Sequence, residues 1–276
     1  MSRIAARFAA LKQDGRGALI PYLTAYDPDQ ATSRAILRGM PGAGADLIEI
    51  GMPFTDPMAD GPIIQAAGLR GLKAGATMAR TLDLVRDFRQ HDADTPIILM
   101  GYLNPIASYG PGRFCADAAQ AGVDGLIIVD LPTEEADMVL PHASASGLDM
   151  IRLVAPTTDD QRLPIVLEGS SGFVYYVSIT GITGTRSPTA DSFAAALPRI
   201  RRATDLPVAI GFGVRTPDQA AAAVCVADAA VVGSALMATL ASSLDAAGRP
   251  APDTAQRVLD QVKALADGVR NARAAL

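Results

Sequence analysis

Short apolar segments recur along the whole chain, and longer segments of mixed polarity separate them. The apolar segments lack a clean alternation of apolar and polar positions, which is typical of parallel strands that are buried on both faces. The pattern predicts eight strands, at residues 18–23, 46–50, 95–100, 123–129, 149–154, 173–177, 206–210 and 229–232.

The segments between these strands predict helices. They cover residues 28–38, 63–74, 77–90, 112–121, 133–146, 158–168 and 191–203, with a further helix from Thr216-Pro217 and alanine-rich helices at the end of the chain. Asp27 is expected to cap the first of them, with Pro28 in its first turn. Thr133 is expected to form a capping box with the acidic residues that follow it, whereas Pro164 fits poorly inside its helix.

The order of these elements predicts the fold. About eight strand–helix units in 276 residues indicate an α/β protein, a (β/α)8 TIM barrel with extra N-terminal and C-terminal helices. An open doubly wound sheet is the alternative, but its usual Gly-x-Gly-x-x-Gly turn does not follow Leu23. Because no linker or short-period repeat interrupts the pattern, we expect a single domain over residues 1–276.

Charge and cysteine content narrow the possible functions. The net charge is −5 and no block of Lys and Arg occurs, which argues against a nucleic-acid partner. Cys115 and Cys225 lie far apart and outside any Cys-x-x-Cys pattern, which fits a reducing, cytoplasmic compartment. No apolar run approaches the roughly 20 residues of a membrane span, so no membrane partner is expected. The first eight residues predict a helix across one end of the domain rather than a signal peptide.

The titratable side chains limit the kinds of chemistry. His91 and His142 fall in or beside predicted helices with no metal-ligand spacing around them, so we expect no metal site and no bound cofactor. No lysine lies at a predicted strand end, which disfavours a Schiff-base aldolase.

Two acidic residues stand out near the second strand. Glu49 lies within that apolar strand, where a carboxylate costs several kcal/mol unless it is paired or protonated. Asp60 lies in the loop that follows. Two neighbouring carboxyl groups cannot both ionise freely, so at least one pKa should rise towards neutrality, which suits general acid/base catalysis. On spacing alone, Asp60 is equally well explained as the N-cap of the helix that follows.

Glycines cluster after three successive strands, at residues 181–184, 211–213 and 233–234. Strand ends of this kind form the active site of a TIM barrel, and exposed backbone amides there bind phosphate. Tight turns alone would also favour glycine. Side chains at strand ends suit the wall of a flat aromatic ligand, or a simple core, namely Tyr22, Met100, Tyr102, Ile127, Tyr175 and Phe212.

Residues 49–62, from Glu49 to Pro62, closely resemble the signature of the tryptophan synthase α subunit family. The resemblance continues at residues 101–105, 130–132, 154–157, 175–178, 184, 211–213 and 233–234. It implies a TIM barrel that cleaves indole-3-glycerol phosphate to indole and D-glyceraldehyde 3-phosphate. It also implies an αββα complex, in which indole tunnels to a β subunit that carries pyridoxal phosphate, whereas this chain holds no cofactor.

The same resemblance assigns roles to residues. Glu49 and Asp60 are implied as the catalytic pair with Tyr175 close by, and the indole ring is placed among Tyr22, Met100, Ile127 and Phe212. The phosphate is placed on the backbone of Gly184, Gly213 and Gly233, with help from Ser234. The loop that holds Asp56 and the loop that holds Thr183 are implied to close over the site and to communicate with the β subunit. Ile179 stands where some members carry arginine, and Tyr22 where some carry phenylalanine.

Three alternatives remain at this point. The chain could be another phosphosugar-handling barrel, such as an isomerase, although such a site needs an acid and a base on opposite sides of the mouth. It could be a catalytically silent partner of a β subunit, which the presence of Glu49 and Asp60 argues against. It could also be a stand-alone indole-3-glycerol-phosphate lyase that needs no β subunit.

Overall fold

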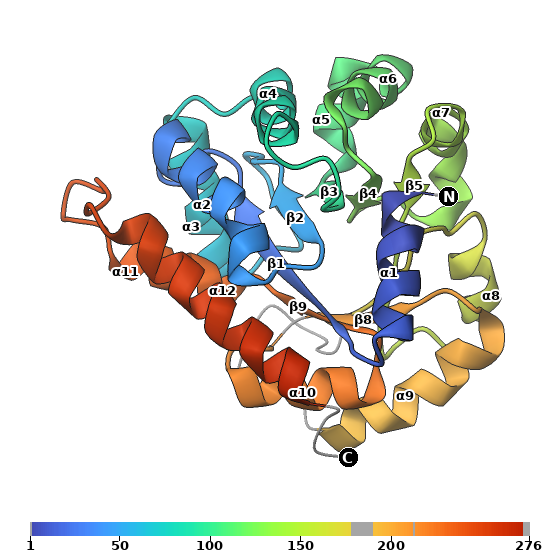
Figure 1. The fold of residues 1–276 in the computed structure, drawn as a ribbon. Coiled ribbons are helices and arrows are strands. Elements are labelled where there is room, and N and C mark those ends of the chain that lie inside the picture. The colour runs from blue at the N-terminus through green and yellow to red at the C-terminus, as the bar shows by residue number, and fades with distance from the viewer. Residues whose placement is uncertain (1, 178–189, 212, 273–276) are drawn as a thin grey trace.

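The computed structural model describes residues 2–177, 190–211 and 213–272, and only the backbone of residues 190–195. Within these ranges, nine parallel strands form a nearly closed barrel with helices around its outside (Figure 1). The TIM barrel expected from the sequence is thereby confirmed.

The strands follow the predicted order. They are β1 (Ala18–Thr24), β2 (Ile48–Gly51), β3 (Ile97–Gly101), β4 (Gly125–Ile128), β5 (Asp149–Met150), β6 (Arg152–Val154), β7 (Val174–Val177), β8 (Val208–Gly211) and β9 (Ala229–Val232). The expected strand at residues 149–154 is divided at Ile151, because its first part pairs with β4 and its second part with β7. This one segment therefore joins the two ends of the sheet.

Helices cover the barrel between most strands. They are α1 (Arg3–Gln13), α2 (Gln30–Ala43), α3 (Pro62–Lys73), α4 (Met78–Arg89), α5 (Leu103–Tyr109), α6 (Pro111–Ala121), the 3-10 helix η1 (Thr133–Met138), α7 (Leu140–Ala145), α8 (Arg162–Leu167), α9 (Ala190–Ala203), α10 (Pro217–Val226), α11 (Ser234–Ser242) and α12 (Thr254–Asn271). Helix α5 was not expected from the sequence. None of the helices in the described ranges is long and apolar enough to cross a membrane.

The predicted caps need two corrections. Helix α2 begins at Gln30, and Asp29 caps it by accepting a hydrogen bond from the amide of Thr32 at 2.8 Å. Asp27 is instead fully buried and forms a bidentate ion pair with Arg70 of α3, at 2.6 and 2.8 Å. The prediction that Asp27 caps the first helix is therefore wrong, because a buried carboxylate needs a cation more than a helix needs this cap.

The expected helix at residues 133–146 is also wrong in detail. It is divided into η1 and α7, and no side chain caps either of them, so the capping box at Thr133 does not form. Pro141, in the first turn of α7, lacks the amide hydrogen that a continuous helix would require there. The residues at 158–168 form a helix only from Arg162, which places Pro164 in the first turn, where a missing N–H costs little.

The core has two parts, one inside the barrel and one between strands and helices. Apolar side chains that point into the barrel form the first part. Helix α1 covers one end of it with Ile4, Phe8 and Leu11. The second lies between the outer face of the strands and the surrounding helices. Alternate residues of each strand serve one or the other.

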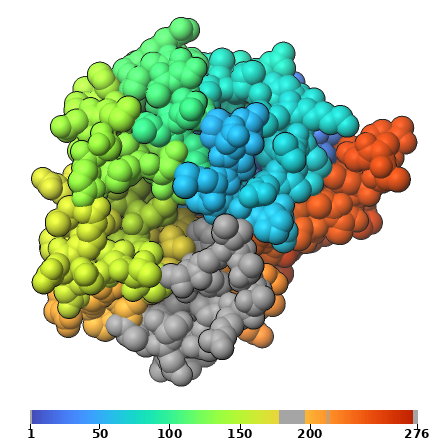
Figure 2. Space-filling model, turned by 180° about the vertical axis from the view of Figure 1, so that it is seen from behind, coloured from blue at the N-terminus to red at the C-terminus, as the bar shows by residue number. Residues whose placement is uncertain are grey.

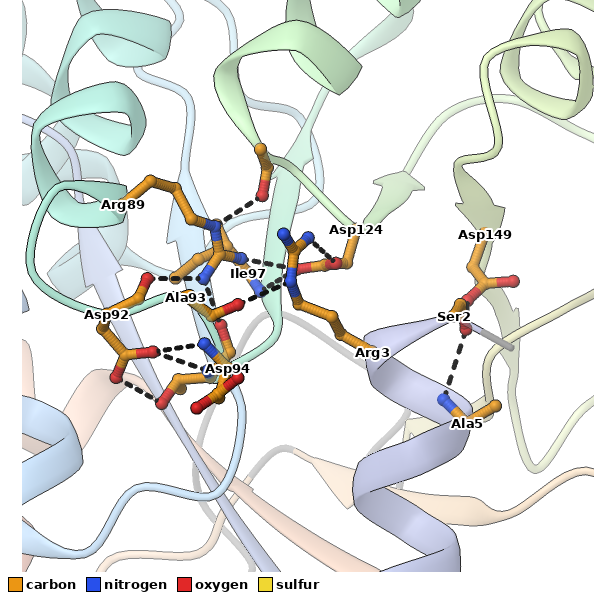
Figure 3. A network of polar contacts seen from close by, with 12 residues as sticks. Ser2, Arg3, Ala5, Arg89, Asp92, Ala93, Asp94, Ile97, Asp124 and Asp149 are labelled. Atoms are coloured by element: carbon orange, nitrogen blue, oxygen red, sulfur yellow. Dashed lines mark hydrogen bonds and ion pairs between the residues drawn. The ribbon is translucent and has the colours of Figure 1, made fainter.

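A polar network fastens α1 to the N-terminal ends of the strands (Figure 3). Asp124, directly before β4, is nearly buried and accepts bonds from Arg3 at 2.8 Å and from Arg89 at 2.7 Å. It also accepts the amide hydrogen of Ile97, at 2.8 Å. Asp46, just before β2 and so two strands away, makes a similar set of bonds with Arg16 and with the amide of Leu19. Buried carboxylates that accept hydrogen bonds from arginines and from backbone amides thus stabilise this end of the barrel.

Candidate active site

Glu49 lies inside the barrel on β2. Its neighbours Ile48 and Ile50 pack towards the helices, so the alternation of the strand turns Glu49 inward. The residue is 1 % exposed, and neither carboxyl oxygen has a hydrogen-bond partner among the described residues. Burial raises the pKa of this carboxyl from 4.5 to about 8. Glu49 therefore holds a proton at neutral pH.

Two tyrosines lie beside Glu49 because two glycines leave room for them. Tyr22 is the β1 residue in register with Glu49, and a Cβ atom on Gly51 would lie 1.9 Å from its hydroxyl oxygen. A Cβ atom on Gly211 would lie 2.0 Å from the hydroxyl oxygen of Tyr175. Burial is the main cause that raises the pKa of both phenols, and the charge of Glu49 adds to it. Both hydroxyl groups therefore stay protonated.

Asp60 reaches the same space from the loop between β2 and α3. Burial raises the pKa of its half-buried carboxyl from 3.8 to about 6, although a hydrogen bond from Tyr102 opposes the rise. The Tyr102 hydroxyl oxygen in turn accepts the amide hydrogen of Ala59 at 3.1 Å, which fixes the loop next to Asp60. The N-cap of α3 is Gly61. The alternative that Asp60 only caps this helix is therefore wrong.

Glu49 on β2 and Asp60 in the loop that follows β2 both lie close to Tyr22. Tyr22 connects them electrostatically, since the charges of Asp60 and of Glu49 both act on its hydroxyl group. The expected rise of a carboxyl pKa is confirmed for both acids. Its cause differs from the expectation, because burial and not the second carboxylate raises each pKa.

Two of the four candidate indole-binding side chains, Met100 and Ile127, are paired on adjacent strands. Gly51, Met100 and Ile127 are in register on β2, β3 and β4. Ile127 is fully buried in the inner core, and Met100 packs against that core while remaining partly exposed. Phe212 lies outside the described residues.

The candidate phosphate-binding residues follow β8 and β9. Gly213 has a φ of +88°, a conformation that side chains other than glycine rarely adopt. Gly233 is the N-cap of α11, whose first residue is Ser234 and which no side chain caps. The N-terminal amides of α11 are therefore free of a capping side chain and suit an anion. A Cβ atom on Gly233 would lie 3.4 Å from Cβ of Tyr22, so this turn lies next to Tyr22. Gly184 and Thr183 lie outside the described residues.

The loop between β2 and α3 is exposed at its tip. Asp56 is exposed, and Met58 has 73 % of its surface exposed, an unusual value for a large apolar side chain. Figure 2 shows this loop, in blue, at the surface on the side of the molecule that is hidden in Figure 1.

Two site residues were missed from the sequence. The sequence identifies Tyr102 only as an aromatic residue at a strand end, yet it is the hydrogen-bond donor to Asp60. The sequence does not single out Thr24, yet its hydroxyl donates to that of Tyr22 at 3.2 Å. The available signal was the position of Thr24 two residues after Tyr22 on one strand, which places both side chains on one face.

A cleft of about 540 Å³ lies away from the candidate site, beside α1 and the start of β8. Its arginines are already engaged, because Arg16 pairs with Asp46 and Arg201 donates to the carbonyl of Val226 at 3.0 Å. Neither acid of the candidate site lines it. Within the described ranges, no group of three His, Cys, Asp or Glu side chains is arranged to hold a metal ion.

Comparison with known proteins identifies the family. The family model described as tryptophan synthase alpha chain matches residues 8–272. The chain belongs to the tryptophan synthase alpha chain family. The membership confirms the expected lyase of tryptophan biosynthesis, which cleaves indole-3-glycerol phosphate, and the alternative functions gain no support.

Relatives in sequence and in structure agree with this family. The tryptophan synthase alpha chain of Gluconacetobacter diazotrophicus is 72 % identical over 273 residues, which cover 99 % of this chain and 100 % of the relative. That of Acidiphilium cryptum is 64 % identical over 275 residues and the full length of both chains. The crystal structure of tryptophan synthase subunit alpha from Legionella pneumophila has a TM-score of 0.89 and 36 % identity, and covers 98 % of this chain and 99 % of that one. An alpha chain in its family also implies a β-subunit partner.

Proposed function

We propose that Glu49 and Asp60 are the acid/base pair of indole-3-glycerol-phosphate cleavage. The observation that carries this proposal is the difference between the two carboxyl groups. Glu49 is enclosed and protonated at neutral pH, whereas Asp60 is half-buried and has a pKa of about 6. The reaction needs one protonated carboxyl group and one ionised carboxylate in the same active site.

In the first step, the carboxylate of Asp60 accepts a hydrogen bond from the indole N–H, and Glu49 gives its proton to C3 of the ring. The positive charge that develops on the ring nitrogen is stabilised by the anionic Asp60. Glu49, now a carboxylate, removes the proton of the side-chain hydroxyl next to the breaking bond. The C–C electron pair returns to the ring as the aldehyde forms, which releases indole and D-glyceraldehyde 3-phosphate.

The remaining candidate residues bind the substrate. Tyr22, Met100, Ile127 and Phe212 surround the indole ring, and the Tyr175 hydroxyl lies beside the reacting atoms. Backbone amides at Gly184, Gly213 and Gly233, with the Ser234 hydroxyl, hold the phosphate. The position of Gly233 at the start of α11 and next to Tyr22 supports this arrangement, because it places the anion site beside the ring site. The phosphate is remote from the breaking bond, so its binding energy serves to position the substrate.

The chain works without a cofactor of its own, in a cytoplasmic α2β2 complex whose β subunit carries pyridoxal phosphate. The exposed Asp56 and Met58 support a role of the β2–α3 loop in contacting that subunit. Since Asp60 belongs to the same loop, contact with the β subunit and the position of this acid are expected to be linked. Thr183, which lies outside the described residues, is assigned the matching role in closure.

Indole release from the purified chain tests the acid/base assignment. The chain has no tryptophan, so indole fluorescence can be followed against a low background. Glu49→Gln and Asp60→Asn are each expected to lower kcat by about 10²- to 10⁴-fold while the barrel stays folded. Glu168→Gln, at an exposed position outside the site, is the matched control and is expected to leave kcat unchanged. Wild-type turnover in either site variant would contradict the assignment.

A further inference from the structure

We propose that Tyr22 and Thr24 form, together with one bound water, a hydrogen-bond chain that keeps Asp60 ionised and aimed at the ring nitrogen of the substrate. The hydroxyl groups of Tyr22 and Thr24 have a positioning role in this view, since they act on the substrate through Asp60, whereas the Tyr22 ring belongs to the proposed indole site. The inference deepens the function proposed for Asp60 and rests on it.

A small cavity joins the three side chains. Tyr22, Thr24 and Asp60 all line it, and the remaining lining is largely apolar, including Met52, Phe54 and Ile64. The cavity offers about 20 Å³ to a water molecule, which is enough for one. A water is held in such a space when it has two to four polar partners, and two hydroxyl groups and a carboxyl group provide three. The cavity therefore has both the size and the lining of a single-water site.

The direction of the hydrogen bond between the two hydroxyl groups leaves a donor available. Thr24 donates to the Tyr22 oxygen at 3.2 Å, so the proton of Tyr22 is not used in that bond. The space left by Gly51 fixes the position of the Tyr22 hydroxyl, and Asp60 is the carboxyl group whose charge acts most strongly on it. The Tyr22 proton can accordingly be directed, through the water, to the Asp60 carboxylate.

Asp60 needs such donors because no cation among the described residues acts on its charge. Among the described residues, the titratable groups that act around Asp60 are Tyr22 from β1, Glu49 from β2, Tyr102 after β3, Asp130 after β4 and Tyr175 from β7. Each of them is neutral or negative in both of its states. Among the described residues, only the hydrogen bond from Tyr102 lowers the pKa of Asp60. A carboxylate can accept about four hydrogen bonds, so a second donor has room to bind beside the indole N–H.

The hydrogen-bond chain from Thr24 through Tyr22 and the water to Asp60 has a defined role in the reaction. The carboxylate must be ionised before the substrate arrives, and one of its oxygens must face the ring nitrogen. Tyr102 donates to Asp60 directly, and the Tyr22–Thr24 pair donates through the water, so together they restrict the orientation of the carboxylate. Hydrogen bonds to the charged form lower a carboxyl pKa, so the chain extends the active range of the enzyme towards acidic pH.

The test compares Tyr22→Phe with Thr24→Val and with the control Tyr109→Phe. The Tyr109 hydroxyl donates to Asp117 at 2.7 Å, away from the site, so its loss tests a generic Tyr-to-Phe effect. The first readout is the carboxyl ¹³C NMR titration of Asp60 in the ligand-free protein, with Asp60→Asn used to identify the signal. The second readout is the acidic limb of the kcat/KM profile for indole release.

Tyr22→Phe is expected to raise the titration midpoint of Asp60, and the acidic limb with it, by about 0.5 to 1 pH unit. Thr24→Val is expected to shift both in the same direction by less, and Tyr109→Phe is expected to shift neither. A high-resolution crystal structure is expected to show one water within hydrogen-bond distance of Tyr22, Thr24 and Asp60.

An unchanged Asp60 titration in a folded Tyr22→Phe variant would overturn the inference. If that variant does not fold, an unchanged titration in Thr24→Val has the same meaning, because this substitution keeps the shape of the side chain. Absence of the water from the crystal structure would also overturn the chain as stated. Indole release by the wild-type chain tests the proposed function separately, so the two failures can be distinguished.

Discussion

Asp124 and Glu49 are acidic residues buried at opposite ends of the same barrel, and their surroundings differ completely. Asp124 accepts bonds from two arginines and one backbone amide near the N-terminal ends of β3 and β4 (Figure 3). Glu49, two strands away and inside the barrel, has no hydrogen-bond partner for either oxygen among the described residues. Burial of an acid therefore does not by itself indicate function, whereas burial without a partner does.

The difference between Asp124 and Glu49 agrees with the different roles of the two faces of a TIM barrel. The N-terminal face of a TIM barrel serves stability, and the C-terminal face carries the chemistry. A paired carboxylate such as Asp124 stabilises the structure only while its cations are present. An enclosed, unpaired carboxyl such as Glu49 remains neutral and can give a proton away. Substitution of Glu49 should therefore lower activity without lowering stability, whereas substitution of Asp124 should lower stability without lowering activity.

The largest expected effect is that of Glu49→Gln. Besides the loss of cleavage, we expect this variant to be more stable than the wild type at pH 9, by on the order of 4 kcal/mol. The pKa of Glu49 is raised from 4.5 to about 8 on folding, so the native state binds the extra proton between these values. This contribution to stability is complete below pH 4.5 and is lost as the pH rises through about 8. Glutamine cannot ionise and loses nothing.

Urea unfolding at pH 5, 7 and 9 measures this difference. The free energies of unfolding of the two proteins are expected to be similar at pH 5 and to separate progressively as the pH rises. Parallel pH profiles would show that Glu49 is solvated or paired in the native protein.

Asp124→Ala should show the opposite behaviour. Its removal leaves Arg89, which is only 11 % exposed, and the amide of Ile97 without their shared acceptor. We expect the free energy of unfolding to fall by about 3 kcal/mol, the lower end for a broken buried ion pair, because the other partner, Arg3, is 42 % exposed and regains water. The kcat of the folded fraction should stay unchanged. A loss of kcat in folded Asp124→Ala would mean that the two ends of the barrel are coupled.

The comparison also explains what the sequence could predict. Glu49 could be found because an acid interrupts an apolar strand, and the eight strands could be found because each is a short apolar segment. The environment of Asp60 could not be found, since it depends on Tyr102, which is distant in sequence and becomes a neighbour only in the folded barrel. Asp27 shows the same limit, because its pairing with Arg70 overrides the local cap that its position before Pro28 suggests. Local patterns thus located elements and isolated anomalies, while long-range pairing decided the partners.

A smaller effect is expected where glycine makes room for a phenol. In Gly51→Ala the new methyl group would lie 1.9 Å from the hydroxyl oxygen of Tyr22, so the ring must move. We expect a loss of about 1 to 3 kcal/mol in the free energy of unfolding and a lower kcat/KM. Gly42→Ala is the matched control, because its Cβ atom would meet nothing within 4 Å and α2 favours alanine. Equal effects of the two substitutions would show that the close approach of Tyr22 to β2 is not required.

The smallest expected effect concerns Arg3, the exposed member of the Asp124 network. Arg3→Met removes one of three bonds to Asp124, but the arginine is 42 % exposed and keeps much of its hydration in the native state. We expect the free energy of unfolding to fall by about 0.5 to 1 kcal/mol at low salt and by less at 1 M salt, because exposed pairs are screened. Arg89→Met, at the buried member, should cost more and depend less on salt. If Arg3→Met proves as costly as Asp124→Ala, the stability of this end depends on how α1 is held over the barrel rather than on the satisfaction of Asp124.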